Sequence, residues 1–233
     1  MYELKTVIWD FNGTILDDLA LVVRTINTLL RARQLEPTTI ERHRQHFGFP
    51  VERYYRGLGF NLEEEPFGEI SREYHDHYLA GLSSCPVHPG AARLLEHLHE
   101  RGLRQFVLSA MQQQLLDQAL RELGADRYFD GIYGLDDLMA RSKVERGRTL
   151  FAEHAVEPHG TLYIGDTDHD VEVARALGCI SVGVAVGHQA MARFDPDHTH
   201  VVGDFEELAA YLDGSQHMGR GRILFTPPGN GAG

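Results

Sequence analysis

The spacing of apolar residues divides the chain into two parts. A short apolar run at residues 6–9 predicts a buried strand. After it, apolar residues recur every three or four positions, which predicts a helix through Leu19, Val22, Val23, Ile26, Leu29 and Leu30. Helical spacing continues over residues 38–82, with breaks near 48–50 and 66–68, where glycine and proline occur. We predict no strand over residues 38–82.

From residue 89 onward, predicted helices alternate with predicted strands. Apolar runs predict strands at 103–108, 131–133, 161–164, 180–186 and 201–202. Leu94, Leu95 and Leu98 mark one helix, and further helices are expected at 115–123, 144–154, 171–177 and 205–212. Three of these helices end at a glycine: Gly102, Gly124 and Gly178. Such alternation predicts an α/β fold with a doubly wound parallel sheet and helices on both of its faces.

The two parts predict a core with an inserted helical cap. We assign residues 1–17 and 85–213 to the α/β core and residues 18–84 to the cap. The tail at 214–233 contains Pro227-Pro228 and several glycines, so we expect an extended arm there. Within this arm, Ile223-Leu224-Phe225 could pair as a short strand.

Composition excludes several classes of function. The net charge of −12 disfavours unspecific attraction to nucleic acid or to an anionic membrane surface. No apolar run approaches the roughly 20 residues that span a bilayer, and the first residues lack a signal-peptide pattern. The two cysteines, Cys85 and Cys179, are far apart, so we expect no disulfide framework and a cytoplasmic location. The sequence does not predict an oligomeric state.

Lysine is rare in this chain. Of 22 basic side chains only Lys5 and Lys143 are lysines, and the others are arginines. A compact ammonium group does a different job from a planar guanidinium. Lys143, just before a predicted helix, is therefore a candidate site residue rather than a generic surface cation.

A carboxylate follows the first predicted strand directly. Open parallel sheets bind their ligands beyond the carboxyl ends of the strands, and Asp10 lies at such an end. Gly13 permits a sharp turn whose free N–H groups could hold an anion. An aspartate in this position could act as a covalent nucleophile. The alternative is an ordinary strand-to-helix turn with Asp10 as a cap.

Two further strand ends carry polar side chains. Asp166 and Asp170 lie four residues apart across a predicted strand-to-helix junction, so both could point toward one hard cation such as Mg²⁺. Acidic capping of the following helix is the competing interpretation. Ser109 ends another strand, where its hydroxyl and the next N–H could bind a phosphate oxygen, or where it could simply cap a helix.

Taken in order, these residues resemble the haloacid dehalogenase-like hydrolase superfamily, and within it the phosphoglycolate phosphatase-like members. The matching pieces are Asp10-Phe11-Asn12-Gly13-Thr14, Ser109, Lys143 and Gly165-Asp166-Thr167-Asp168-His169-Asp170. The resemblance implies Mg²⁺-dependent hydrolysis of a small phosphorylated metabolite through an aspartyl-phosphate intermediate.

The resemblance also implies a role for each matching position. The catalytic residues would be Asp10 as nucleophile, Asn12 and Lys143. The metal would be held by Asp10, the backbone carbonyl of Asn12 and Asp166, with Asp170 acting through water or by orienting Lys143. Substrate binding would fall to Gly13, Thr14, Ser109, Ala110, Lys143 and, from the cap, Arg53.

The sequence departs from the family pattern at Asn12, where phosphatases of this family carry a second aspartate. An amide cannot exchange a proton with a leaving group near neutral pH. Three consequences are open. The substrate could have a leaving group that needs little protonation, as in acyl phosphates, aryl phosphates or diphosphates. Another residue, such as His46, Arg53 or His169, could assist. Alternatively, the chain could be a weakly active or inactive phosphate-binding sensor or partner protein.

Three related activities fit the sequence less well. The phosphonate-cleaving relatives use a cap lysine, and residues 18–84 contain no lysine. Haloacid dehalogenases lack the paired acidic motif found at Asp166 and Asp170. Phosphosugar mutases need the second aspartate that Asn12 replaces.

Overall fold

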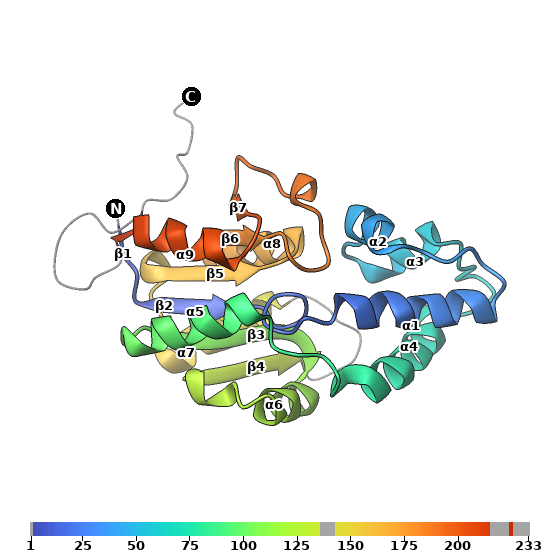
Figure 1. The fold of residues 1–233 in the computed structure, drawn as a ribbon, viewed down its shortest axis with the longest axis horizontal. Helices are drawn as coiled ribbons and strands as arrows, with labels where there is room; N and C mark the ends of the chain where they lie inside the picture. Colours follow the sequence, from blue (N-terminus) through green and yellow to red (C-terminus); the bar gives the residue numbers. More distant parts are fainter. Residues whose placement is uncertain (1, 136–142, 215–223, 226–233) are drawn as a thin grey trace.

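Six parallel strands form the central sheet of the protein, in the order β4-β3-β2-β5-β6-β7 (Figure 1). The computed structural model describes residues 2–135, 143–214 and 224–225. The strands are β2 Thr6–Trp9, β3 Arg104–Gln112, β4 Gly131–Leu135, β5 Thr161–Gly165, β6 Ile180–Val184 and β7 His200–Val202. The doubly wound parallel α/β fold predicted from the sequence is thereby confirmed.

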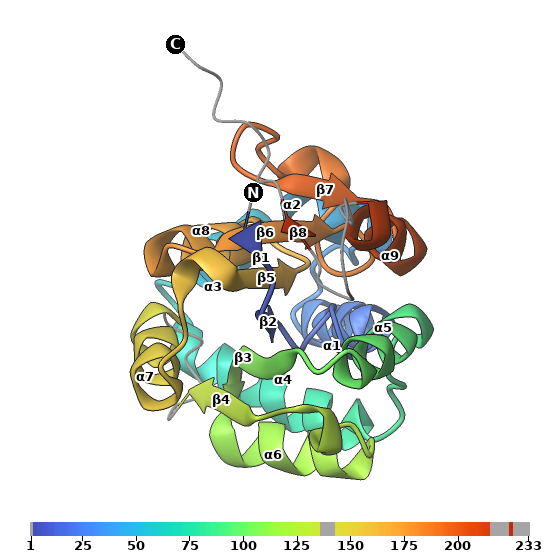
Figure 2. The ribbon, with the colours of Figure 1, turned by 90° about the vertical axis from the view of Figure 1, so that its left-hand side faces the viewer.

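Helices cover both faces of this sheet. The core helices are α5 Pro89–Glu100, α6 Gln113–Glu122, α7 Val144–His154, α8 Asp168–Leu177 and α9 Phe205–Gly214. Figure 2 shows α7 and α8 on one face and α5 and α9 on the other. Because side chains alternate along a strand, Val7 and Trp9 pack in the same cluster as residues of α5 and α9, whereas Ile8 packs with residues of α7 and α8. Every residue of β2 is buried, as expected for a central parallel strand.

Four helices lie beyond the carboxyl end of the sheet (Figure 1). They are α1 Leu19–Ala32, α2 Ile40–His46, α3 Val51–Gly57 and α4 Phe67–Leu82, and we call them the cap helices. The predicted break at 48–50 separates α2 from α3, and Pro66 immediately precedes α4. The cap helices fall within the predicted cap segment, 18–84, whose bounds as a separate domain stay a prediction. In the part of the chain described, no helix is long and apolar enough to cross a bilayer.

Several element bounds differ from the sequence prediction by a few residues, and two of the differences have a clear physical reason. Helix α8 begins at Asp168 rather than 171, because Asp170 accepts a hydrogen bond from the backbone N–H of Thr167, the residue before the helix, at 3.1 Å. Strand β3 continues past 108 to Gln112, since an irregular register carries it over to a second pairing with Leu135 of β4.

A further difference from the sequence prediction concerns the chain ends. Strand β1, Tyr2–Glu3, was not predicted, and it pairs antiparallel with β8, Leu224–Phe225. Two residues of the apolar run that could pair, Leu224 and Phe225, thus form a short strand, and Ile223 lies outside the described residues. The rest of the predicted arm beyond Gly214 lies outside the described residues.

A buried polar contact ties the central strand to its neighbour. The indole N–H of Trp9 donates to Oε1 of Gln105 at 3.1 Å, and the Gln105 amide donates to the carbonyl of Leu95 in α5 at 2.9 Å. Both Trp9 and Gln105 are completely buried. A single glutamine side chain therefore satisfies two groups that would otherwise be unpaired in the core.

We predict that Gln105→Leu lowers the free energy of unfolding by about 2–4 kcal/mol, because it leaves the Trp9 N–H and the Leu95 carbonyl unpaired in the interior. Urea unfolding followed by the fluorescence of Trp9, the only tryptophan, measures this change. Gln114→Leu, on the exposed side of α6, is the control, and we expect a change within about 0.5 kcal/mol. An equal effect of the two substitutions would contradict the prediction.

Candidate active site

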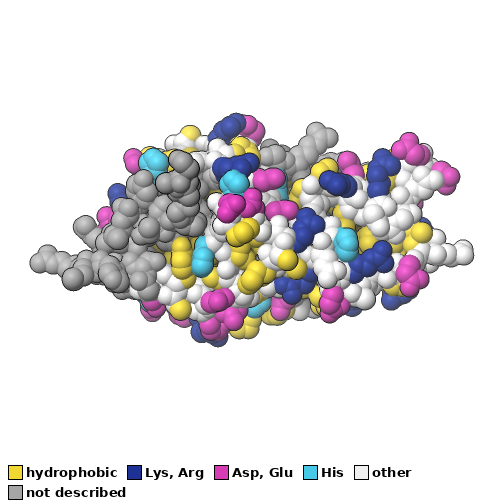
Figure 3. Space-filling model, turned by 90° about the horizontal axis from the view of Figure 1, so that it is seen from above, with side chains coloured by type: hydrophobic (Ala, Val, Ile, Leu, Met, Phe, Trp, Pro, Cys, Tyr) yellow, Lys and Arg dark blue, Asp and Glu magenta, His cyan; other side chains and the backbone are white. Residues whose placement is uncertain are grey.

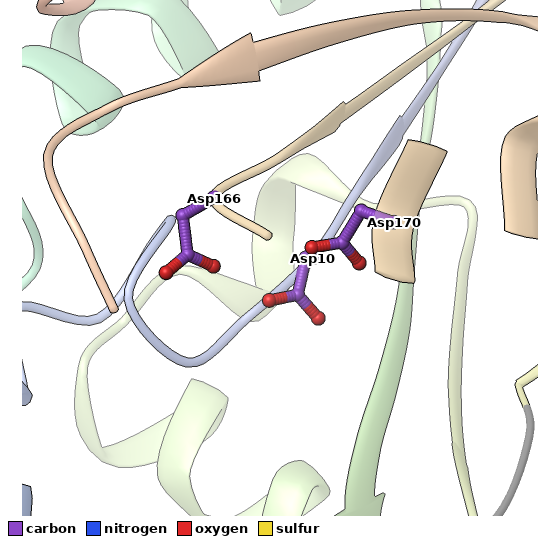
Figure 4. A group of neighbouring side chains, drawn as sticks. All are labelled: Asp10, Asp166 and Asp170. Atoms are coloured by element: carbon purple, nitrogen blue, oxygen red, sulfur yellow. The ribbon is translucent and has the colours of Figure 1, made fainter. Parts of the chain in front are cut away.

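Three carboxylates meet beyond the carboxyl ends of neighbouring strands. Asp10 follows β2 and Asp166 follows β5, which pairs with β2, and Asp170 comes from the first turn of α8 (Figure 4). One oxygen atom of each lies within 4.8 Å of the others, and all three residues are buried. The parallel pairing of β2 with β5 thus brings Asp10 beside two residues that lie 156 and 160 positions further along the chain.

Lys143 joins two of these carboxylates. It directly precedes α7, its side chain is only 3% exposed, and its ammonium donates to Oδ1 of Asp10 at 2.8 Å and to Oδ1 of Asp170 at 2.5 Å. Among the described residues, none donates a hydrogen bond to the second oxygen of Asp10, and Asp10 lines a cavity. Lys143 therefore orients the Asp10 carboxylate, and the second oxygen of Asp10 is left available to a ligand in the cavity.

The other two carboxylates are fixed by groups of the core. Oδ2 of Asp170 accepts from the backbone N–H and the hydroxyl of Thr167, at 3.1 and 2.6 Å. Asp166 accepts from the hydroxyl of Thr14 at 3.2 Å and from the backbone N–H of His188 at 2.5 Å. Gly13 passes beside Asp166 with a φ of +76°, and a Cβ there would lie 2.3 Å from a carboxylate oxygen, so only glycine fits.

The site carries more negative than positive charge. Burial raises the pKa of Asp10 to about 8; Lys143 opposes this shift, and Asp170 and Asp166 reinforce it. Burial likewise raises the pKa of Asp166 to about 6, against the attraction of His188. The pKa of Asp170 is lowered instead, because Lys143 and Thr167 outweigh the effect of burial. Three carboxylates beside one ammonium form an all-oxygen donor set that fits a hard divalent cation.

Asn12 belongs to a second group of polar side chains, which the sequence did not reveal. Its amide donates to Oδ2 of Asp18 at 3.0 Å and to the hydroxyl of Tyr78 at 2.8 Å. The Asp18 carboxylate also accepts from the Gly13 N–H at 2.9 Å, from the Tyr78 hydroxyl at 2.6 Å and from Nε2 of His188 at 3.1 Å. We call these five residues the Asp18 network.

Asp18 and His188 form an ion pair inside the network. Burial acts to raise the pKa of Asp18, but the charge and hydrogen bond of His188, with those of Tyr78 and Asn12, bring it below its ordinary value. For His188, burial is likewise outweighed, chiefly by Asp18, and the pKa rises to about 9. Nδ1 of His188 lies 3.3 Å from Nε2 of His43, whose pKa burial lowers to about 3. A charged His188 therefore donates to a neutral His43 in the cap helix α2.

A cavity of about 190 Å³ opens above Asp10. Ser109, Ala110 and Lys143 line it beside Asp10, and the Ser109 hydroxyl accepts from the backbone N–H of Met111 at 3.1 Å. The other two predicted contacts of the phosphoryl group, Gly13 and Thr14, are occupied elsewhere. The Gly13 N–H binds Asp18 and the Thr14 hydroxyl binds Asp166, and neither residue is among the described lining residues.

Arg53 lies away from the carboxylates. It is exposed on α3 and lines a separate hollow of about 430 Å³ together with Arg42, His46 and Arg193. In Figure 3, basic side chains are spread over the cap half of the visible face and are interrupted by acidic ones. His169 packs against the ring of Phe49, with the ring centres 4.5 Å apart. None of the three suggested helpers, His46, Arg53 and His169, is among the described residues that line the cavity above Asp10.

Comparisons with known proteins agree with this arrangement. Residues 7–184 match the family described as haloacid dehalogenase-like hydrolase. The chain is 24% identical over 192 residues to phosphoglycolate phosphatase 1 of Pseudomonas aeruginosa, covering 79% of this chain and 70% of that protein. It is 25% identical over 217 residues to a phosphoglycolate phosphatase of Rhodobacter capsulatus, covering 89% of this chain and 96% of the relative.

Solved structures show the same fold. A haloacid dehalogenase-like family hydrolase from Streptococcus pneumoniae superposes with a TM-score of 0.76 at 21% identity, over 89% of this chain and 98% of that chain. The match of the family to most of the chain agrees with the resemblance found at Asp10, Lys143 and Asp166. The protein thus belongs to the haloacid dehalogenase-like hydrolase family.

Proposed function

We propose that this protein is a Mg²⁺-dependent phosphatase that hydrolyses a small phosphorylated molecule through an aspartyl-phosphate on Asp10. The observation that carries the proposal is the Asp10 carboxylate, held by Lys143 through one oxygen while the other is left for a substrate at the base of a cavity. The relatives named phosphoglycolate phosphatase support hydrolysis of a phosphoric monoester.

The metal ion would be held by Asp10, Asp166 and the backbone carbonyl of Asn12. A bound Mg²⁺ would supply positive charge to the oxygens of the transferring phosphoryl group. The excess of buried carboxylate over ammonium supports this assignment. Asp170 has both oxygens engaged by Lys143 and Thr167, so we assign it the positioning of the ammonium group rather than direct ligation.

Each residue of the site would have its own role in the reaction. Asp10 attacks phosphorus with its unpaired carboxylate oxygen, and Lys143 offsets the charge on the phosphoryl oxygens. The Ser109 hydroxyl and the Ala110 N–H bind the same oxygens, and the cap helices limit access of water. Water then hydrolyses the aspartyl-phosphate and returns Asp10 to its starting state.

Asn12 limits this chemistry at one point. Its amide has no proton to give a leaving group, and its N–H groups already bind Asp18 and Tyr78. General acid–base catalysis typically contributes about 10²–10⁴-fold to a rate. The same residue is the basis of the alternative function, a phosphate-binding sensor or partner protein with little turnover, which the following experiments distinguish from an enzyme.

We predict that Asp10→Asn abolishes phosphate release, with a loss of at least about 10³-fold, because the nucleophile is replaced by a neutral amide. The substitution keeps the side-chain shape, so urea unfolding is expected to show a folded protein. Asp17→Asn, seven residues away and exposed, is the matched control and should keep the wild-type rate. Residual turnover near the wild-type level in Asp10→Asn would point to another nucleophile.

Asn12→Asp should raise turnover of alkyl phosphates by about 10²-fold and change turnover of aryl phosphates much less. The new carboxyl group beside buried Asp18 would retain a proton that it can donate to an alkoxide. The same substitution should lower the free energy of unfolding by about 1–3 kcal/mol, because it cannot replace both amide hydrogen bonds. An unchanged ratio of alkyl to aryl rates would speak against this role of Asn12.

Removal of divalent ions should abolish activity and lower thermal stability together. A ligand that binds only the folded state at 100 times its Kd stabilises it by about 2.7 kcal/mol. We expect Mg²⁺ to raise the unfolding temperature of the EDTA-treated protein, and to do so much less in Asp166→Asn. Calorimetry with and without Mg²⁺ measures both. The same stabilisation in wild type and Asp166→Asn would place the ion elsewhere.

A further inference from the structure

The cavity above Asp10 has a charged base and an apolar wall. At its base lie Asp10, Lys143 and Asp166, whereas toward the cap helices it is lined by the aromatic rings of Phe47, Phe49, Tyr55, Phe67, Tyr74 and Tyr78. Several of these rings touch one another, as Tyr74 stacks on Tyr78 with centres 5.6 Å apart and Phe67 meets the edge of Tyr55 at the same distance. The part of a substrate beyond its phosphoryl group would therefore meet aromatic faces and edges.

Cations are scarce along this wall. Among the described residues that line the cavity, Lys143 is the only lysine or arginine, and it is already paired with Asp10 and Asp170. The charged His188 also lines the cavity, but it is paired with Asp18 at 3.1 Å. One arginine of α2 and one of α3, Arg42 and Arg53, line the separate hollow instead. A substrate with a second anionic group, such as a carboxylate, would have to bury that charge against apolar rings without a partner, which is strongly unfavourable.

Three polar side chains that reach the wall, those of Tyr78, His75 and Asn12, are engaged within the protein. The Tyr78 hydroxyl donates to Asp18, and His75 binds the carbonyl of Ser71 at 2.6 Å. Asn12, at the boundary between base and wall, gives its N–H groups to Asp18 and Tyr78. The wall therefore offers contact area to an apolar group, and the base offers no proton at Asn12.

From the apolar wall and the lack of a proton donor at Asn12, and resting on the proposed function, we propose that the substrate is an aryl phosphate, the phosphoric monoester of a phenol. The bond between phosphorus and the phenolic oxygen breaks as the bond from Asp10 to phosphorus forms, and the oxygen leaves with the electron pair as phenolate. A phenol has a pKa near about 10, so its anion departs without a donated proton. Hydrolysis of the aspartyl-phosphate by water then releases phosphate and one proton, which the phenolate takes up in solvent.

Five substrates separate recognition of the ring from the ease of leaving. Phenyl phosphate and acetyl phosphate both have good leaving groups, but only phenyl phosphate has an aromatic ring. Benzyl phosphate and ethyl phosphate are both alkyl esters, and only benzyl phosphate has a ring. Phosphoglycolate carries the second anionic group. We expect kcat/KM for phenyl phosphate to exceed kcat/KM for acetyl phosphate by about tenfold or more. The same excess is expected for kcat/KM of benzyl phosphate over that of ethyl phosphate. Phosphoglycolate should be worse than phenyl phosphate by at least about 100-fold.

Two results would overturn the assignment. Turnover of phosphoglycolate as efficient as that of phenyl phosphate would show that the cavity accepts a second anion. Equal kcat/KM for benzyl and ethyl phosphate, which both release an alkoxide, would show that the rings recognise nothing. In both cases a phosphatase remains, whereas phosphate release from none of the five substrates would refute the proposed function itself.

Substitutions in the wall test the contact directly. Phe67→Ala and Phe49→Ala should each reduce the ratio of kcat/KM for phenyl to acetyl phosphate by about tenfold. This ratio is measured within one preparation, so partial unfolding of a variant does not change it. Phe129→Ala removes a half-buried ring that is not among the described lining residues, and it should leave the ratio unchanged. An unaltered ratio in both wall variants, or an equal fall in Phe129→Ala, would contradict the proposal.

Discussion

The buried carboxylate of Asp18 is the contact on which the arrangement of the site depends. It is 1% exposed and accepts four hydrogen bonds, from Asn12, Gly13, Tyr78 and His188. An isolated buried carboxylate would be strongly destabilising, and these donors, one of them charged, make its burial tolerable. Because Asn12 and Gly13 follow β2, Tyr78 belongs to α4 and His188 follows β6, one side chain connects the sheet to the cap helices.

The same contact links the fold to the chemistry. The loop from Asp10 to Gly13 is held at one end by Lys143 and at the other by Asp18. The backbone N–H of His188 binds Asp166, so the residue that pairs with Asp18 also fixes a carboxylate beside Asp10. The asparagine at position 12 suits this arrangement, since an amide can donate to Asp18 where a second carboxylate would repel it. A position that resembles a lost acid thus has a structural role of its own.

The sequence predicted the parts of the structure that follow local rules. Parallel strands bring their carboxyl ends to one edge, so Asp10 and Asp166 could be placed together from strand ends alone. Ser109 was expected at a strand end as well, but it lies within β3, which continues to Gln112. Lys143 was found through the rarity of lysine, and its position beside Asp10 matches that expectation. The roles assigned to these residues stay predictions, because proximity does not establish chemistry.

The sequence could not predict contacts between distant side chains. Tyr78 and His188 lie 60 and 170 positions from Asp18, and no periodicity relates them. Asp18 itself directly precedes a predicted helix, and a polar residue in that position is common at protein surfaces. Gln105 likewise gave no signal, since a glutamine in a strand is seldom fully buried. Arg53 was assigned to substrate binding because of its charge, but it lines the separate hollow on the face of α3.

The scarcity of lysine has a practical consequence for chemical labelling. Lys5 is exposed at the surface, whereas Lys143 is enclosed by two carboxylates that hold its pKa well above the ordinary value against the effect of burial. Acylating reagents attack only the unprotonated, accessible amine, so they should mark Lys5 rapidly and Lys143 slowly. The ratio of the two modified peptides in a mass spectrum then measures how far the protein shields the Lys143 amine, with an internal reference in every molecule.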